Sequence, residues 1–291
     1  MSTVTLAAQP PTQPATINAR AGRTRSLVWP REHGAWGILL VPLATGAAVG
    51  LETGRGFLPL LLFTLAALAL FCLRVPAEVL LETTPLRAQS PAERRTVISY
   101  LCLFAAMAAG SLVFLFWREH AYGLLLLGAA AAVAFSAQAA LRKLGRDTRM
   151  SSQLVGSIGL TSTAAGAYYV AAGQLDALAL VLWAANWLFA ANQIHYVQLR
   201  IHAARLVRSE KLARGWAFLL GESATAFLLL LAGRFALLPV WAALAFVPVL
   251  LRGLAWFLRP SAPLQVRRLG QSELAHAIVF GVLLILGLQL G

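Results

Sequence analysis

Long apolar stretches recur along the whole chain and constrain its fold more than any other feature. Each is about as long as the ~20 residues that a helix needs to cross the hydrocarbon core of a bilayer. A segment inside a bilayer must satisfy its backbone hydrogen bonds internally, so each stretch is expected to be a helix. The sequence therefore predicts an all-α, polytopic membrane helical bundle of about nine transmembrane helices. The expected spans cover residues 34–51, 57–82, 97–117, 121–141, 152–172, 176–199, 213–233, 235–258 and 272–290.

The composition excludes the other broad classes of protein. Charged residues make up 12% of the 291 residues, about half the usual share in a soluble domain, while 59% are hydrophobic. The two cysteines, Cys72 and Cys102, are too few for a disulfide framework or a cysteine-ligated zinc site. Residues 1–28 carry no apolar run and are predicted to be a disordered cytoplasmic tail rather than a signal peptide. Residues 29–291 are predicted to form one transmembrane domain.

The basic residues predict the orientation of the spans. The chain has 24 Lys and Arg against 11 Asp and Glu, a net charge of +13. With the N-terminus inside, the tail and the inner loops hold 19 of the 24 basic residues and the outer loops hold three. Basic loops remain on the cytoplasmic side, so the N-terminus is expected inside and the C-terminus outside, in a bacterial inner membrane. Because these arginines lie between apolar segments, nucleic acid is not an expected partner.

Polar side chains gather near the predicted cytoplasmic ends of at least six spans. An ionisable group inside a span is costly and by default marks a functional site. Two sets repeat at four-residue spacing, which places side chains on one face of a helix. If their helices share a depth, the two faces could line one cavity open to the cytoplasm. The first set is Arg74, Glu78 and Glu82, and the second is Asn192, Tyr196 and Arg200.

Five further residues are candidates for binding a ligand in this cavity. They are His33, Lys143, Glu222, Arg252 and Glu273. Each could instead pair locally or extend its charge to the inner interface, as Arg74 and Glu78 could do on one helix face.

Three glycines of the fifth span, Gly156, Gly159 and Gly166, are interpreted as sites of close helix packing. Ser90-Pro91-Ala92-Glu93 predicts the start of a short helix in the second inner loop.

Three local strings resemble a known family. They are Pro30–Trp36 (PREHGAW), Ile194–Ile201 (IHYVQLRI) and Arg268–Leu274 (RLGQSEL), and they are similar to the YwiC-like membrane proteins. The nine spans and the two polar sets resemble, more widely, the UbiA superfamily of intramembrane prenyltransferases. That resemblance implies a UbiA-like bundle. In the enzymes of the superfamily, aspartates at these two sets hold magnesium ions that bridge a prenyl diphosphate.

The chain departs from the superfamily at those positions. Glu78 and Glu82 could hold one Mg²⁺, since hard cations prefer oxygen ligands. The second set offers no carboxylate, so a two-metal site is not expected. Arg74 and Arg200 could instead bind an anionic group directly.

Two functions follow from this pattern and stay open. The first is a UbiA-like scaffold whose cytoplasm-facing cavity binds an anionic lipid or an isoprenoid-type ligand. The second is a divergent prenyltransferase, in which Glu78, His195 and Tyr196 are the candidate catalytic residues. Haem binding through histidines and transport of protons or ions are weaker alternatives. Membrane lipids are the expected partners, and the sequence does not predict an oligomeric state.

Overall fold

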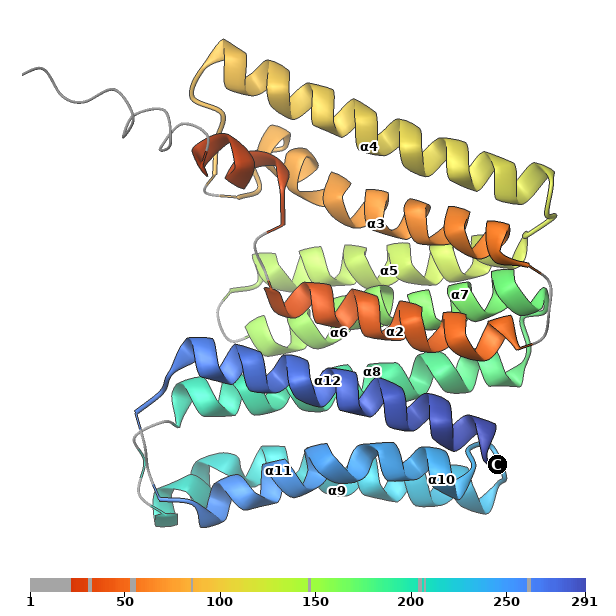
Figure 1. The fold of residues 1–291 in the computed structure, drawn as a ribbon. Coiled ribbons are helices and arrows are strands. Elements are labelled where there is room, and N and C mark those ends of the chain that lie inside the picture. The colour runs from red at the N-terminus through yellow and green to blue at the C-terminus, as the bar shows by residue number, and fades with distance from the viewer. Residues whose placement is uncertain are drawn as a thin grey trace, which may run out of the picture. The chain divides into compact units, whose positions relative to one another are not determined.

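The computed structural model describes residues 22–30, 33–52, 56–84, 86–145, 148–203, 206, 208–260 and 263–291. In this part of the chain every regular element is a helix (Figure 1). A short helix over residues 22–28 comes first. The others are α2 (His33–Leu51), α3 (Phe57–Leu80), α4 (Pro91–Trp117), α5 (Gly123–Lys143), α6 (Arg149–Thr161), α7 (Thr163–Ala172), α8 (Ala177–His202), α9 (Arg208–Arg234), α10 (Val240–Ala243), the 3₁₀ turn η1 (Leu244–Phe246), α11 (Val247–Leu258) and α12 (Val266–Gln289).

The predicted helical membrane bundle is confirmed. Among the described residues, eight helical segments are long and apolar enough to cross a membrane. The fifth expected span is two helices, α6 and α7, that meet at Ser162. The hydroxyls of Thr161, Ser162 and Thr163 donate to carbonyls three or four residues earlier. Such bonds compete with the helical ladder and account for the break.

Two other helix boundaries follow from proline and serine chemistry. Pro248 has no N–H for the carbonyl of Leu244, and the chain forms the 3₁₀ turn η1 just before it. Ser90 Oγ accepts from the Glu93 N–H at 3.2 Å, and Glu93 Oε2 accepts from the Gln89 N–H at 2.7 Å. This reciprocal cap starts α4. The short helix expected there is therefore the first turn of a 27-residue helix.

Two compact units divide the chain, and each is considered by itself. Unit 1 comprises residues 1–31 and 66–110, and unit 2 comprises residues 32–65 and 111–291. In unit 1, Leu27 and Val28 are buried against Val79 and Val97. The tail predicted as disordered is thus helical over residues 22–28, because this apolar pair is buried there. Residues 1–21 lie outside the described part of the chain.

Unit 2 is a set of helices side by side (Figure 1). Its core packs α2 against α7 and includes the stacked rings of Phe189 and Phe280, whose centroids are 4.1 Å apart. The three glycines interpreted as packing sites are confirmed as such, since a Cβ on each would overlap the side chain of Gln138, Phe135 or Phe63. The C-terminal ends of α8 and α11 and the N-terminal ends of α9 and α12 lie together, at the left in Figure 1.

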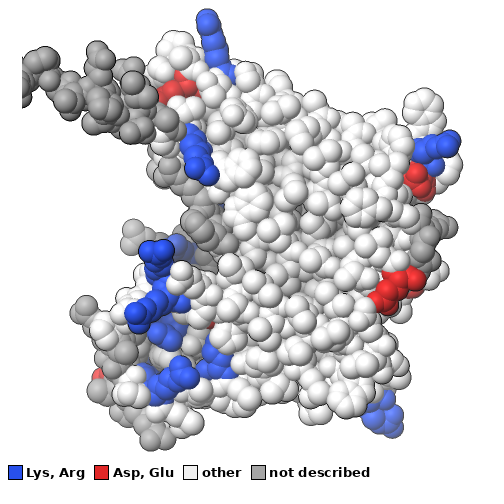
Figure 2. All heavy atoms as spheres, viewed as in Figure 1, with Lys and Arg blue, Asp and Glu red and all other residues white. Residues whose placement is uncertain are grey.

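Charged side chains on the face drawn in Figure 2 gather at the ends of the helices. The surface between them is without charge, as expected for a lipid-facing band. A further set of polar and charged side chains, described below, is instead buried inside unit 2.

Candidate functional site

Four helices of unit 2 bring together four of the predicted site residues in a buried charge network. They are Asn192 of α8, Glu222 of α9, Arg252 of α11 and Glu273 of α12. Asn192, Glu222 and Glu273 are each only 5–6% exposed. Charged side chains are almost never buried unless they are paired, so the partners of each decide what this network can do.

Arg252 lies at the centre of the charge network. Its Nη1 forms an ion pair with Glu273 Oε2, and the two side chains are only 9% and 7% exposed. Its Nη2 donates to Asn192 Oδ1 at 3.1 Å, and Asn192 Nδ2 in turn donates to Glu222 Oε1 at 2.9 Å. The Asn192 amide therefore links a cation to a carboxylate, and each end of the amide has its matching partner.

An aromatic ring covers one face of this arginine. The Arg252 Cζ lies 4.0 Å from the ring centroid of Tyr196, one turn along α8 from Asn192. A guanidinium over an aromatic face is stabilised by the ring quadrupole, most strongly when both are desolvated. The guanidinium is thus held by an ion pair, a hydrogen bond and a ring, which fixes its orientation.

Gly253 allows the helices to approach closely at this point. A Cβ at this position would overlap the Glu222 carboxylate. Because Gly253 has no side chain, α9 can lie against α11 with the Glu222 carboxylate beside the backbone of Gly253. Sequence reasoning missed this residue, although a glycine next to an intramembrane arginine is a signal for close approach.

Two further cations lie nearer the helix ends. Arg200 Nη1 donates to the Tyr196 hydroxyl at 3.1 Å. Lys211 is only 2% exposed; its Nζ donates to the carbonyl of Arg259 at 2.8 Å and lies 4.9 Å from the Trp256 ring centroid. Lys211 was not predicted as a site residue, because it precedes the expected start of its span.

The charge network is not fully satisfied. Among the described residues, Arg200 Nε, Arg252 Nε and Glu273 Oε1 are buried and have no hydrogen-bond partner. Buried polar atoms in folded proteins almost always have a partner in protein or water. These three atoms are the polar groups of the network that a further polar partner could satisfy.

Two neighbours on α8 complete the surroundings. Gln193 Nε2 donates to the backbone carbonyl of Glu273 at 2.9 Å, which ties α8 to α12 next to the ion pair. His195, a candidate catalytic residue, lies edge-on to Phe218 with the ring centroids 5.2 Å apart. Phe218 belongs to α9 and also contacts the ring of Tyr196, so His195 and Tyr196 both pack against α9.

The first polar set belongs to unit 1 and is not a continuous helical stripe. α3 ends at Leu80, and Glu82 has a φ of 54°, so only Arg74 and Glu78 share a helix face. Arg74 Nε pairs with Glu78 Oε1 at 2.8 Å, and Arg87 pairs with Glu82 at 3.5 Å. The part of the chain that the structure describes holds no group of three or more His, Cys, Asp and Glu side chains that could bind a metal ion.

The comparisons with known proteins concern the first half of the chain. Residues 29–169 match the family model described as YwiC-like protein. Over this range the chain is similar to that family. With its apolar helices, it is a multi-pass membrane protein. No curated protein and no solved structure was found to match.

The YwiC-like range ends before the charge network begins. It reaches from the start of α2 into α7, whereas Asn192, Glu222, Arg252 and Glu273 all follow residue 169. Of the remaining candidates, Lys143 is exposed at the end of α5. His33 is the first residue of α2, and its side chain lies outside the described part.

Proposed function

We propose that this YwiC-like chain is a UbiA-like membrane scaffold that binds an anionic lipid or isoprenoid-type ligand at its cytoplasmic side. The observation that carries the proposal is the pair formed by Arg200 and Lys211. Among the described residues, neither has a carboxylate within ion-pair distance, whereas Arg252 is paired with Glu273. Lys211 is buried and Arg200 is partly buried. A buried charge without a counterion costs several kcal/mol, roughly, so an anion beside Lys211 would be stabilised.

The surroundings of Arg200 suit a phosphate or diphosphate headgroup. Its Nε is buried and without a partner, and the guanidinium fork can present two parallel donors to an anion. The hydroxyl of Tyr196 accepts from Arg200 and still has a proton to donate. Beside these polar groups, Phe218, Trp256 and Phe257 form a buried apolar cluster.

Prenyl transfer receives no comparable support. Of its candidate catalytic residues, Glu78 is paired with Arg74, His195 packs against Phe218 and Tyr196 lies over Arg252. One Mg²⁺ on Glu78 and Glu82 stays a prediction. An ion there would have to replace the two arginines that now pair with these acids, so no step is derived through a metal.

Mass spectrometry of the lipids that remain bound to the purified protein tests the proposal. The wild type is compared with the double variant Arg200→Ala/Lys211→Ala and with Arg267→Ala, whose arginine is exposed near the start of α12. We expect one anionic or isoprenoid lipid to be enriched in the wild type and in Arg267→Ala and lost from the double variant. Equal profiles of bulk phospholipid in all three proteins would refute the proposal.

A turnover assay then separates binder from enzyme. Purified protein is incubated with farnesyl diphosphate, and released diphosphate is measured. Binding without release supports the scaffold, and release that depends on Glu78 supports the transferase instead.

A further inference from the structure

Glu222 of α9 is a buried acid in the charge network, and its direct partner is not a cation. The residue is 5% exposed, and among the described residues no Lys, Arg or His lies within ion-pair distance of its carboxyl oxygens. Arg252 is already paired with Glu273. An ionised Glu222 would therefore add an uncompensated negative charge to the interior of a membrane-spanning bundle, which is costly.

The orientation of Asn192 shows how Glu222 is bonded. An arginine can only donate, so the end of the Asn192 amide that faces Arg252 must be Oδ1. The other end is then Nδ2, and Glu222 Oε1 must accept from it, at 2.9 Å. Oε1 can accept in this way from an ionised or a neutral acid, which leaves Oε2 as the position for a proton.

The carboxyl group is closely packed on its α11 side. A Cβ on Gly253 would overlap both Glu222 Oε1 and the ring of Phe218, so the acid and the ring lie side by side against the backbone of α11. Phe218 is itself only 1% exposed and precedes Glu222 by one turn of α9. An aromatic ring and a glycine backbone replace the solvation that an ionised carboxylate would need.

The helices that pack against α9 bring few titratable groups toward Glu222. From α11, Arg252 reaches it only through the amide of α8 described above. From α8, His195 lies on the same side, since a Cβ on Gly221 would be 3.3 Å from its Nδ1. The short helix α10, Val240–Ala243, has no titratable side chain. None of these helices gives Glu222 a cation of its own.

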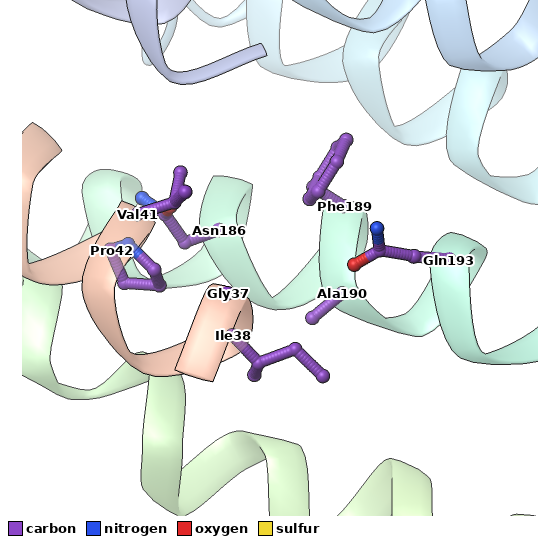
Figure 3. A pocket seen from close by; sticks show the side chains of 8 residues that line it. All are labelled: Gly37, Ile38, Val41, Pro42, Asn186, Phe189, Ala190 and Gln193. Carbon is purple, nitrogen blue, oxygen red and sulfur yellow. The ribbon is translucent and has the colours of Figure 1, made fainter. Parts of the chain in front are cut away.

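The cation at the edge and the pocket beside the network supply no counterion either. Lys211 precedes Glu222 by eleven residues, which is about 16 Å along the axis of α9. Figure 3 shows a pocket between α2 and α8 whose polar side chains are Asn186 and Gln193. Both are neutral amides, and no member of the charge network lines this pocket.

We infer that Glu222 is a proton-binding site, at which the acid is held in its neutral form inside the bundle. Oε2 carries the proton while Oε1 accepts from Asn192. The charge network then has no net charge, because Arg252 and Glu273 balance each other. A proton is favoured over a metal cation, since Asn192 turns its NH₂ group rather than its oxygen toward the acid.

Infrared spectroscopy of the purified protein tests the site, because a neutral carboxylic acid has a C=O stretching band that a carboxylate lacks. At neutral pH we expect this band in the wild type, with the shift in D₂O that lipid esters do not show, and its loss in Glu222→Gln. Glu119→Gln is the matched control and should keep the band, since Glu119 is exposed between α4 and α5. A wild type without the band, or an equal band in Glu222→Gln, would overturn the inference. So would loss of the band when NaCl replaces choline chloride, because Na⁺ would then displace the proton.

Thermal unfolding in detergent gives an independent test. Glutamine is a neutral isostere of the protonated acid and can still accept from Asn192, so Glu222→Gln should be at least as stable as the wild type at neutral pH. The Tm of the wild type should fall relative to that of the variant as the pH rises from acidic to alkaline, because the unfolded chain releases a proton that the folded chain retains. A variant that is less stable than the wild type at neutral pH, or that fails to fold, would overturn the inference, since the ionised acid would then make a contact that glutamine cannot.

Discussion

Arg252→Met is expected to destabilise unit 2 strongly. The change removes the cation from a buried ion pair and leaves the Glu273 carboxylate, whose side chain is 7% exposed, without its partner. It also removes the donor to Asn192 Oδ1 and the cation over the Tyr196 ring. Methionine fills a similar space, so the effect reports lost electrostatics more than a cavity.

The structure sets the size of the effect. Removing one partner of a buried ion pair costs about 3–5 kcal/mol, and both side chains here are at least nine-tenths buried. For a protein of about this size, 1 kcal/mol corresponds to a Tm shift of roughly 2–4 °C. The expected decrease in Tm is therefore on the order of 10 °C.

Thermal unfolding in one detergent, followed by tryptophan fluorescence, measures the decrease. Arg234→Met is the control, because this arginine is exposed at the end of α9. The double variant Arg252→Met/Glu273→Met should recover at least half of the loss, since apolar replacement of a whole buried pair is often neutral. A Tm within about 2 °C of wild type for Arg252→Met would refute the reasoning, because the lost pairing would then be worth less than about 1 kcal/mol.

Three further predictions concern packing, a partly exposed ion pair and a metal. Gly46→Ala should lower the free energy of unfolding by about 1–3 kcal/mol, because the added Cβ would overlap the backbone of α7. Gly128→Ala is the control and should be neutral, because its Cβ would meet open space. Chemical denaturation of both variants measures the two free energies. Arg74→Met should cost no more than about 1 kcal/mol in the same assay, since its pair with Glu78 is about 30% exposed. If Mg²⁺ binds at Glu78 and Glu82, calorimetry should detect heat on titration that Glu78→Gln abolishes; equal heats would exclude this site.

The spans could be predicted because few physical rules determine them. A bilayer fixes the length of a crossing helix and forbids unpaired backbone, so apolar length alone located the eight helical segments that are long and apolar enough to cross a membrane. The break at Ser162 could not be found this way. It depends on hydroxyls that compete for backbone carbonyls, and residues 152–172 are apolar enough to suggest one continuous helix.

The candidate site was predicted in its residues but not in its pairings. Depth along the spans indicated Asn192, Glu222, Arg252 and Glu273 as interior polar groups. Their partners lie on different helices, and the rotation of a helix that is apolar on most sides cannot be found from periodicity. The pair of Arg74 and Glu78 was predictable because both residues lie on one helix, whereas the helix end at Leu80 removed Glu82 from the expected stripe.

The charge network divides into a paired centre and an unpaired edge, and the two halves call for different explanations. At the centre, Arg252 and Glu273 neutralise each other, so their loss should lower stability whether or not a ligand binds. At the edge, Arg200 and Lys211 carry charge that no described carboxylate balances. Arg200→Ala/Lys211→Ala should lose a bound anion, and its Tm should also decrease, because Lys211 is 2% exposed and loses its contacts with Arg259 and Trp256. If the double variant instead retains the same lipid as the wild type, Arg200 and Lys211 have a structural role and the ligand lies elsewhere.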